Sequence, residues 1–213
     1  MPLTIRLFFY TILVGILSIS TIEAQSKSEC FDIADTDRLQ KAFLSFENDI
    51  FNHYKCEDTL KTYRTFLAEV ASLSINIRKL PSPQSIALTR EFKTSSNNEN
   101  SLWVKLSDYE KPETSHLTTD TDTTPADTGK HNEEVLTFNY RGGFIQCLKN
   151  TSEISDFQEI ITSLEQDGNI SPSLTSQKVY YLLDKDLNTI EVKSFIAFDI
   201  YYSILMVVEK AFK

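Results

Sequence analysis

Residues that commonly perform chemistry are scarce in this sequence. Its 213 residues include only five glycines, three histidines and three cysteines. No Gly-rich phosphate loop, HExxH zinc motif or Ser nucleophile elbow occurs. His116 and His131 fall in or beside a polar tract, and His53 stands alone near the end of an amphipathic helical pattern. A lone imidazole of this kind is usually a boundary residue, so the sequence predicts no catalytic residue and no enzyme.

Positive charge is also in short supply. The chain carries 21 Lys and Arg against 30 Asp and Glu, a formal net charge of -9. Nucleic acids and anionic membranes both require a basic face, so neither is expected as a partner. Residues 107–134 hold eight of the acidic residues and two of the lysines, which is six of the nine excess negative charges. The remainder of the chain is therefore only mildly acidic.

The apolar run near the N-terminus is short for a transmembrane helix, so a retained membrane anchor is the weaker interpretation of this segment. It follows Arg6, extends over residues 7–19 and gives way to hydroxyl residues and the small residue Ala24. A spanning helix needs about 20 apolar residues, whereas this pattern is typical of a secretory signal peptide. We expect residues 1–24 to be cleaved. Residues 25–213 then form a single globular domain, secreted to the extracellular space, without membrane insertion of the mature chain.

The mature chain keeps an odd number of cysteines. In a secreted protein, three cysteines suggest one disulfide bond and one remaining thiol. A helix between Cys30 and Cys56 would hold its ends roughly 25 Å apart, which makes a bridge between them awkward. We therefore expect Cys56 to pair with Cys147. Cys30 is then the candidate for an interchain bond to a protein partner, and the alternative is that Cys30 is a buried or capped thiol.

Helical periodicity marks both ends of the mature chain. Residues 35–55 and 58–80 each carry one apolar stripe and are joined by a short connection, which predicts an antiparallel helical hairpin. The period returns at residues 154–164, a helix that we expect to end at Gly168 in a left-handed cap. Residues 174–183 are predicted as a further helix, although their Val and Tyr content is also typical of a strand.

A period of two replaces the helical period in the middle of the chain. The pattern predicts one hairpin from residues 86–92 and 102–106, and a second from residues 136–140 and 144–148 around a turn at residues 141–143. The expected fold class is α+β. It combines the N-terminal helical hairpin, a small antiparallel sheet of three or four strands, and C-terminal helices around a buried last helix.

That last helix is predicted from the nearly uninterrupted apolar residues 189–213. At 100° per residue, Asp199, Ser203 and Lys210 lie on one narrow stripe of the helix. Nearly all of the remaining helix surface is apolar. Such a helix must be covered on most sides. We expect the polar stripe to face solvent, so the substitution Asp199→Leu should be tolerated.

Two kinds of glycosylation are suggested by the polar segments. Eight of the fifteen residues 114–128 are Ser or Thr, so residues 107–134 are predicted to be a disordered acidic loop. The loop is either bare, or it is an O-glycosylated or partner-binding tract. Sequons at Asn150 and Asn169 predict an N-glycosylated protein. Asn150 could instead form a helix capping box with Glu153.

A stretch that resembles the start of a calcium loop follows the second sequon. Asp184, Asp186 and Asn188 fit positions 1, 3 and 5 of an EF-hand, but the central Gly and the closing Glu are missing. A polar turn between helices is the simpler interpretation. No metal ion and no cofactor is therefore expected.

The sequence predicts a secreted, non-enzymatic protein-binding or signalling protein that a protein partner recognises. The alternative is a carrier of a small apolar ligand, because the last helix supplies the large apolar residues Phe195, Phe198, Tyr201, Tyr202 and Met206. A degenerate EF-hand-like calcium-binding protein is a minor alternative.

Overall fold

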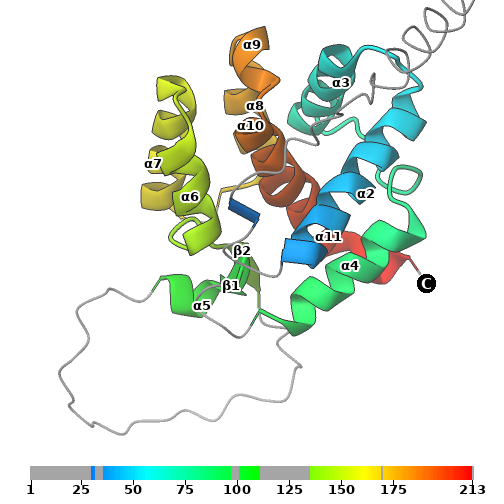
Figure 1. Cartoon of the computed structure of the whole chain (residues 1–213). Coiled ribbons are helices and arrows are strands. Elements are labelled where there is room, and N and C mark those ends of the chain that lie inside the picture. The colour runs from blue at the N-terminus through cyan, green and yellow to red at the C-terminus, as the bar shows by residue number, and fades with distance from the viewer. Residues whose placement is uncertain (1–29, 32–35, 97–100, 111–134, 169, 213) are drawn as a thin grey trace, which may run out of the picture.

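The computed structural model describes residues 30–31, 36–96, 101–110, 135–168 and 170–212. The predicted signal peptide, most of the predicted acidic loop and Asn169 lie outside these ranges. Helices predominate in the described residues, and a small sheet lies at one end of them (Figure 1). The elements are α2 (Thr36–Tyr54), α3 (Thr59–Ala71), α4 (Pro83–Thr94), β1 (Trp103–Lys105), α5 (Leu106–Tyr109), β2 (Leu136–Phe138), α6 (Gly143–Thr151), α7 (Ser155–Asp167), α8 (Pro172–Tyr180), α9 (Asp184–Leu187), α10 (Ile190–Phe195), the π-helix η2 (Ile196–Tyr202), α11 (Ser203–Val208) and the 3₁₀-helix η3 (Glu209–Ala211).

Four of the predicted helices are present. The hairpin of α2 and α3 forms as expected, although α3 ends at Ala71, well before residue 80. The Ser72 hydroxyl donates to the Ala68 carbonyl at 2.7 Å, and Leu73 takes a positive φ of 58°, which ends the helix. Helix α7 ends at Gly168, whose φ of 73° suits a residue without a Cβ. Residues 172–180 form the helix α8 rather than a strand.

The predicted strand over residues 86–92 is wrong, because these residues belong to α4. The Ser82 hydroxyl caps this helix by accepting from the Ser85 backbone N–H, and Pro83 occupies its first turn. Its buried residues Ser85, Leu88, Thr89 and Phe92 follow the spacing of one helical face. The strand predicted over residues 144–148 is likewise replaced by a helix, α6.

The sheet consists of two antiparallel strands, not three or four. Strand β1 pairs with β2, with Trp103 opposite Phe138 and Lys105 opposite Leu136. One strand of each predicted hairpin is therefore present, and the two pair with each other. The Trp103 indole N–H donates to the Ser203 hydroxyl at 3.0 Å and so attaches the sheet to α11. The fold class is therefore broadly α+β, with two strands in place of the predicted three or four.

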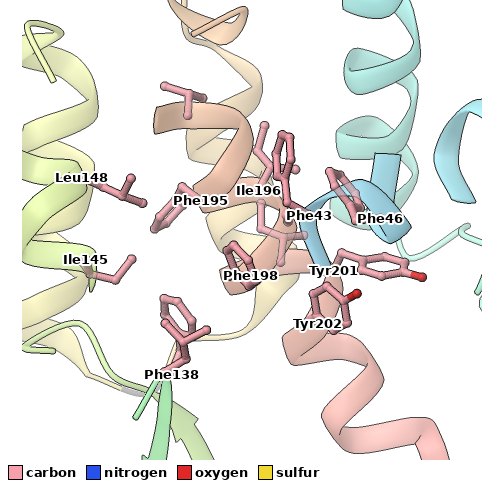
Figure 2. Packing of buried hydrophobic residues seen from close by; sticks show 14 of the residues in the cluster. Phe43, Phe46, Phe138, Ile145, Leu148, Phe195, Ile196, Phe198, Tyr201 and Tyr202 are labelled. Carbon is pink, nitrogen blue, oxygen red and sulfur yellow. The ribbon is translucent and has the colours of Figure 1, made fainter. Parts of the chain in front are cut away.

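The last segment is the buried centre of the fold, as predicted. All seven residues of η2 are buried. Figure 2 shows Phe198 of this segment between Ile145 of α6 and Phe43 of α2, with Tyr201 close to Phe46 of α2. The Phe198 ring lies 5.2 Å from that of Phe144, and the Tyr201 ring lies 5.1 Å from that of Phe46. The upstream amphipathic helices cover this segment.

Only Lys210 of the polar stripe is exposed, which corrects our expectation that the stripe faces solvent. Asp199 is only 2 % exposed, and its Oδ1 atom accepts a hydrogen bond from the Tyr140 hydroxyl at 2.8 Å. Ser203 is half-buried and accepts from Trp103. Residues in and beside the sheet therefore cover Asp199 and Ser203, and Asp199→Leu would leave the buried Tyr140 hydroxyl without its acceptor. That substitution is therefore not expected to be tolerated.

The start of the predicted acidic loop is ordered, because residues 106–109 form α5. Tyr109 is buried, and the Arg141 guanidinium lies 4.5 Å from the centre of its ring. In the ranges that the structure describes, no helix combines the length and the apolar character needed to cross a membrane.

The disulfide bond joins Cys30 to Cys147, with the Cα atoms 5.6 Å apart, so the predicted Cys56–Cys147 bridge is wrong. Cys56 is a free, half-buried thiol. Helix α2, which lies between Cys30 and Cys56 in the sequence, has 19 residues and is therefore about 28 Å long; α6, which carries Cys147, lies at the Cys30 end. Because Cys30 is bonded within the chain, it is not available for the predicted interchain bond.

Peptide mapping under non-reducing conditions should recover Cys30 and Cys147 in one cross-linked peptide. Iodoacetamide should alkylate Cys56 without prior reduction, because this thiol is free and partly accessible. Digestion after reduction is the control and should release all three cysteine peptides separately. A cross-linked peptide that contains Cys56 would contradict the pairing.

Candidate functional site

Helix α8 lies antiparallel along α3. The Ser173 hydroxyl donates to the Ala71 carbonyl at 3.5 Å at one end of the pair. At the other end, Arg64 of α3 reaches the residues that follow α8. The buried residues Thr175, Ser176 and Val179 of α8 occupy one face of the helix, whereas Tyr180, its last residue, is partly exposed.

Arg64 fixes the turn between α8 and α9. Its guanidinium group donates to the carbonyls of Tyr180 and Leu182 and to the Asp184 carboxylate, the last at 2.7 Å. It also lies 5.3 Å from the centre of the Tyr180 ring. The planar, forked guanidinium is suited to several simultaneous hydrogen bonds. One side chain therefore holds the backbone of this turn at two carbonyl groups and binds the Asp184 carboxylate beside them.

The turn that Arg64 holds carries large exposed apolar side chains. Tyr181 is 82 % exposed and Leu183 is 59 % exposed. The Tyr180 and Tyr181 rings lie 5.6 Å apart and nearly perpendicular. We call residues 180–183 the tyrosine turn. It offers apolar surface on a backbone that is already ordered, which lowers the entropic cost of binding.

A cleft of about 590 Å³ adjoins the tyrosine turn. One wall is the connection from α6 to α7, and the other is formed by α9 and the start of α10. Leu183 belongs to both the turn and the cleft, so the two features form one continuous surface. The cleft is lined by Thr151, Ser152, Glu153, Ile154, Ser155, Asp156, Leu183, Lys185, Asp186, Thr189 and Glu191.

The cleft is negatively charged. Its lining holds four carboxylates and one ammonium group, a net charge of 1 − 4 = −3. None of the four carboxylates, Glu153, Asp156, Asp186 and Glu191, forms an ion pair with another described residue, whereas nearby Asp184 pairs with Arg64 and Glu165 pairs with Lys149. We call this feature the acidic cleft.

The predicted calcium residues do not form a calcium loop. Asp184 and Asp186 lie in the short helix α9, and Asn188 follows it as an exposed residue. The Asp184 carboxylate is engaged by Arg64. Among the described residues, no group of three or more His, Cys, Asp or Glu side chains could hold a metal ion. The segment is the polar connection between helices that the sequence also allowed.

Asn150 is exposed near the end of α6, directly before the residues that line the cleft. The predicted capping box of Asn150 with Glu153 is not formed, because α7 begins only at Ser155 and its cap residue is Ile154. The Ile154 backbone N–H donates instead to the Ser152 hydroxyl at 3.2 Å. A glycan on Asn150 would stand at the edge of the acidic cleft.

The aromatic residues considered for an apolar ligand pack as core residues. Phe195, Phe198, Tyr201 and Tyr202 are fully buried, and each makes at least one ring contact with a neighbour. The Tyr202 hydroxyl donates to the Ala42 carbonyl at 3.0 Å. These contacts join the last helix to α2 and α6.

Comparison of the chain with protein-family models, with curated protein sequences and with solved structures gives no significant match. The case for a function therefore rests on the geometry of the tyrosine turn and the acidic cleft.

Proposed function

We propose that the chain is a secreted, extracellular, non-enzymatic protein-binding or signalling protein, and that its protein partner docks on the tyrosine turn and the adjoining acidic cleft. Secretion is supported by the signal-peptide pattern of residues 1–24. Two sequons and a disulfide bond agree with an extracellular location.

The observation that carries this proposal is the exposure of Tyr181 on a turn whose backbone Arg64 holds. Tyrosine is enriched among the residues that dominate binding energy, because its large ring loses little conformational entropy when it is buried. An exposed aromatic side chain on a backbone that is held in place, next to a cleft, offers a partner both an anchor and a recess. Polar residues around it match the usual arrangement of an apolar centre with a polar rim.

The buried carboxylates agree with a non-enzymatic function. Asp49 and Asp199 are both buried and accept hydrogen bonds from tyrosine hydroxyl groups inside the core. Their hydrogen bonds join one structural element to another. Groups in such positions connect parts of the core and are enclosed away from solvent.

The double variant Tyr181→Ser/Leu183→Ser should weaken partner binding by about 30-fold or more, because truncating a central anchor typically costs about 2 kcal/mol or more. The partner is first identified by cross-linking on the cells that receive the secreted protein. The dissociation constant is then measured by biolayer interferometry with the purified partner.

The matched control is Val207→Ser, since Val207 is 81 % exposed but lies on α11. It should bind like the wild type. An equal loss in both variants, or no loss in the double variant, would contradict docking at the tyrosine turn. Retention of the wild-type protein inside the cells that make it would contradict the secretion part of the proposal.

A further inference from the structure

We infer that the partner presents a lysine or arginine next to an apolar side chain, and that the basic side chain enters the acidic cleft while the apolar one packs on the tyrosine turn. This inference rests on the proposed function and specifies the partner of the same surface.

Charge complementarity favours a basic side chain. The carboxylates of Glu153, Asp156, Asp186 and Glu191 are not neutralised by ion pairs with described residues, and Lys185 leaves the net charge of the lining at −3. A concave site of one sign attracts the opposite charge and repels like charge during the encounter. An acidic or purely apolar partner segment would leave these carboxylates without compensation.

The shape of the cleft favours a side chain over a metal ion. Its volume of about 590 Å³ falls within the roughly 300–1,000 Å³ of sites that enclose small ligands. The carboxylates come from both walls, and no three of them are close enough to hold one metal ion among the described residues. An arginine or lysine side chain carries several donors on a long stem and can therefore reach carboxylates that a single ion cannot bridge.

The position of Leu183 favours an apolar neighbour for the basic residue. Leu183 lines the cleft and is also the last residue of the tyrosine turn. A partner segment whose basic side chain occupies the cleft therefore places its adjacent residues over Leu183 and Tyr181. Burial of these exposed apolar surfaces stabilises the complex. The charge of the cleft fixes the orientation of the partner segment.

A peptide library displayed on phage tests this inference. It is selected on the immobilised wild-type protein without prior depletion, and the triple variant Glu153→Gln/Asp186→Asn/Glu191→Gln is used only afterwards, to compare affinities. The expected result is several-fold enrichment of Lys or Arg beside apolar residues, relative to the unselected library. Synthetic peptides from the selection should bind the wild type about 10-fold more tightly than the triple variant, with a difference that shrinks at high salt. No enrichment of basic residues, or equal affinity for both proteins, would overturn the inference.

The variant Tyr181→Ser/Leu183→Ser separates this inference from the proposed function. If selected peptides lose affinity for this variant but not for the cleft variant, the tyrosine turn binds peptides, and the inference that a basic side chain enters the acidic cleft is wrong. If neither variant changes the affinity, the proposed docking of a partner on this surface is wrong. Both variants should keep the circular dichroism spectrum and urea midpoint of the wild type, because the substituted side chains are not part of the buried core.

Discussion

Replacing Asp49 with alanine is expected to lower the free energy of unfolding by about 3–5 kcal/mol. Asp49 is 5 % exposed, and its Oδ2 atom accepts hydrogen bonds from the Ser82 backbone N–H at 3.0 Å, the Ser85 hydroxyl at 2.6 Å and the Tyr201 hydroxyl. Alanine would leave these donors buried without their acceptor. Each such loss costs about 1–3 kcal/mol, although the costs are not additive.

The Asp49 carboxylate has this effect because it connects three separate elements. It lies on α2, and its donors come from the start of α4 and from η2. Burial, and after it the charge of Asp49, raises the pKa of Tyr201, so the tyrosine hydroxyl remains a donor throughout the ordinary pH range. The carboxylate therefore fixes how the last helix sits against α2 and α4.

Urea unfolding followed by circular dichroism measures the effect. The conservative variant Asp49→Asn keeps an acceptor oxygen and should lose less than half as much free energy as Asp49→Ala. Equal losses in the two variants, or a loss below about 1 kcal/mol for alanine, would show that these hydrogen bonds contribute little.

The Asp199→Asn variant is expected to be more stable than the wild type at pH 8, with an advantage that disappears in acid. Burial raises the pKa of Asp199 to about 7, and the hydrogen bond from Tyr140 opposes the rise only in part. In the unfolded chain the pKa of an aspartate is about 3.9. The folded protein therefore binds a proton that the unfolded chain releases between these two pH values.

The direction of the effect follows from this difference. Because the folded-state pKa is raised, the stability that Asp199 contributes is fully present below about pH 4 and falls as the pH rises to about 7. Above that pH the folded protein holds a buried carboxylate. Roughly three pKa units correspond to about 4 kcal/mol. Asparagine is neutral at every pH and retains an oxygen that accepts from Tyr140, so the variant escapes this loss.

Urea unfolding at about pH 4.5 and pH 8 tests the expectation for both proteins. The advantage of Asp199→Asn should grow by about 3 kcal/mol between the two conditions. Glu159→Gln on α7 is the control, because Glu159 is exposed; its effect should stay within about 0.5 kcal/mol at both pH values. An advantage that does not change with pH would mean that Asp199 has the same proton affinity in the folded and unfolded chains.

Helices with one apolar stripe were predictable from the sequence, and the two strands that became helices were not. Residues 86–92 alternate apolar and polar residues, yet the buried positions Ser85, Leu88 and Thr89 follow the helical period. Two of these positions are polar, so an apolar pattern alone misses them. The pair Ser82 and Pro83 was the available signal, since it combines a favoured cap with a favoured first-turn residue.

The candidate site could be predicted only in part. The sequence indicated an exposed polar segment at Asp184 and Asp186, which contributes one wall of the acidic cleft. It did not indicate Arg64, because its contacts with Tyr180 and Leu182 join residues more than a hundred positions apart. The exposure of Tyr181 follows from where α8 packs on α3, which is a property of the tertiary structure.

The error in the disulfide pairing has a similar origin. The length of the helix after Cys30 correctly separated that residue from Cys56. The choice between the two for Cys147 depended on which end of α2 lies near α6, and no local pattern encodes that.

The pairing of β1 with β2 has a consequence for how the gene can change. Because Lys105 lies opposite Leu136, the segment between these two residues begins and ends at neighbouring positions of the sheet. The conformational entropy of closing a loop between two such points changes by only about 0.6 kcal/mol for each doubling of its length. Insertions and deletions in the codons for residues 111–134 can thus accumulate at little thermodynamic cost, while the tyrosine turn and the acidic cleft keep their geometry.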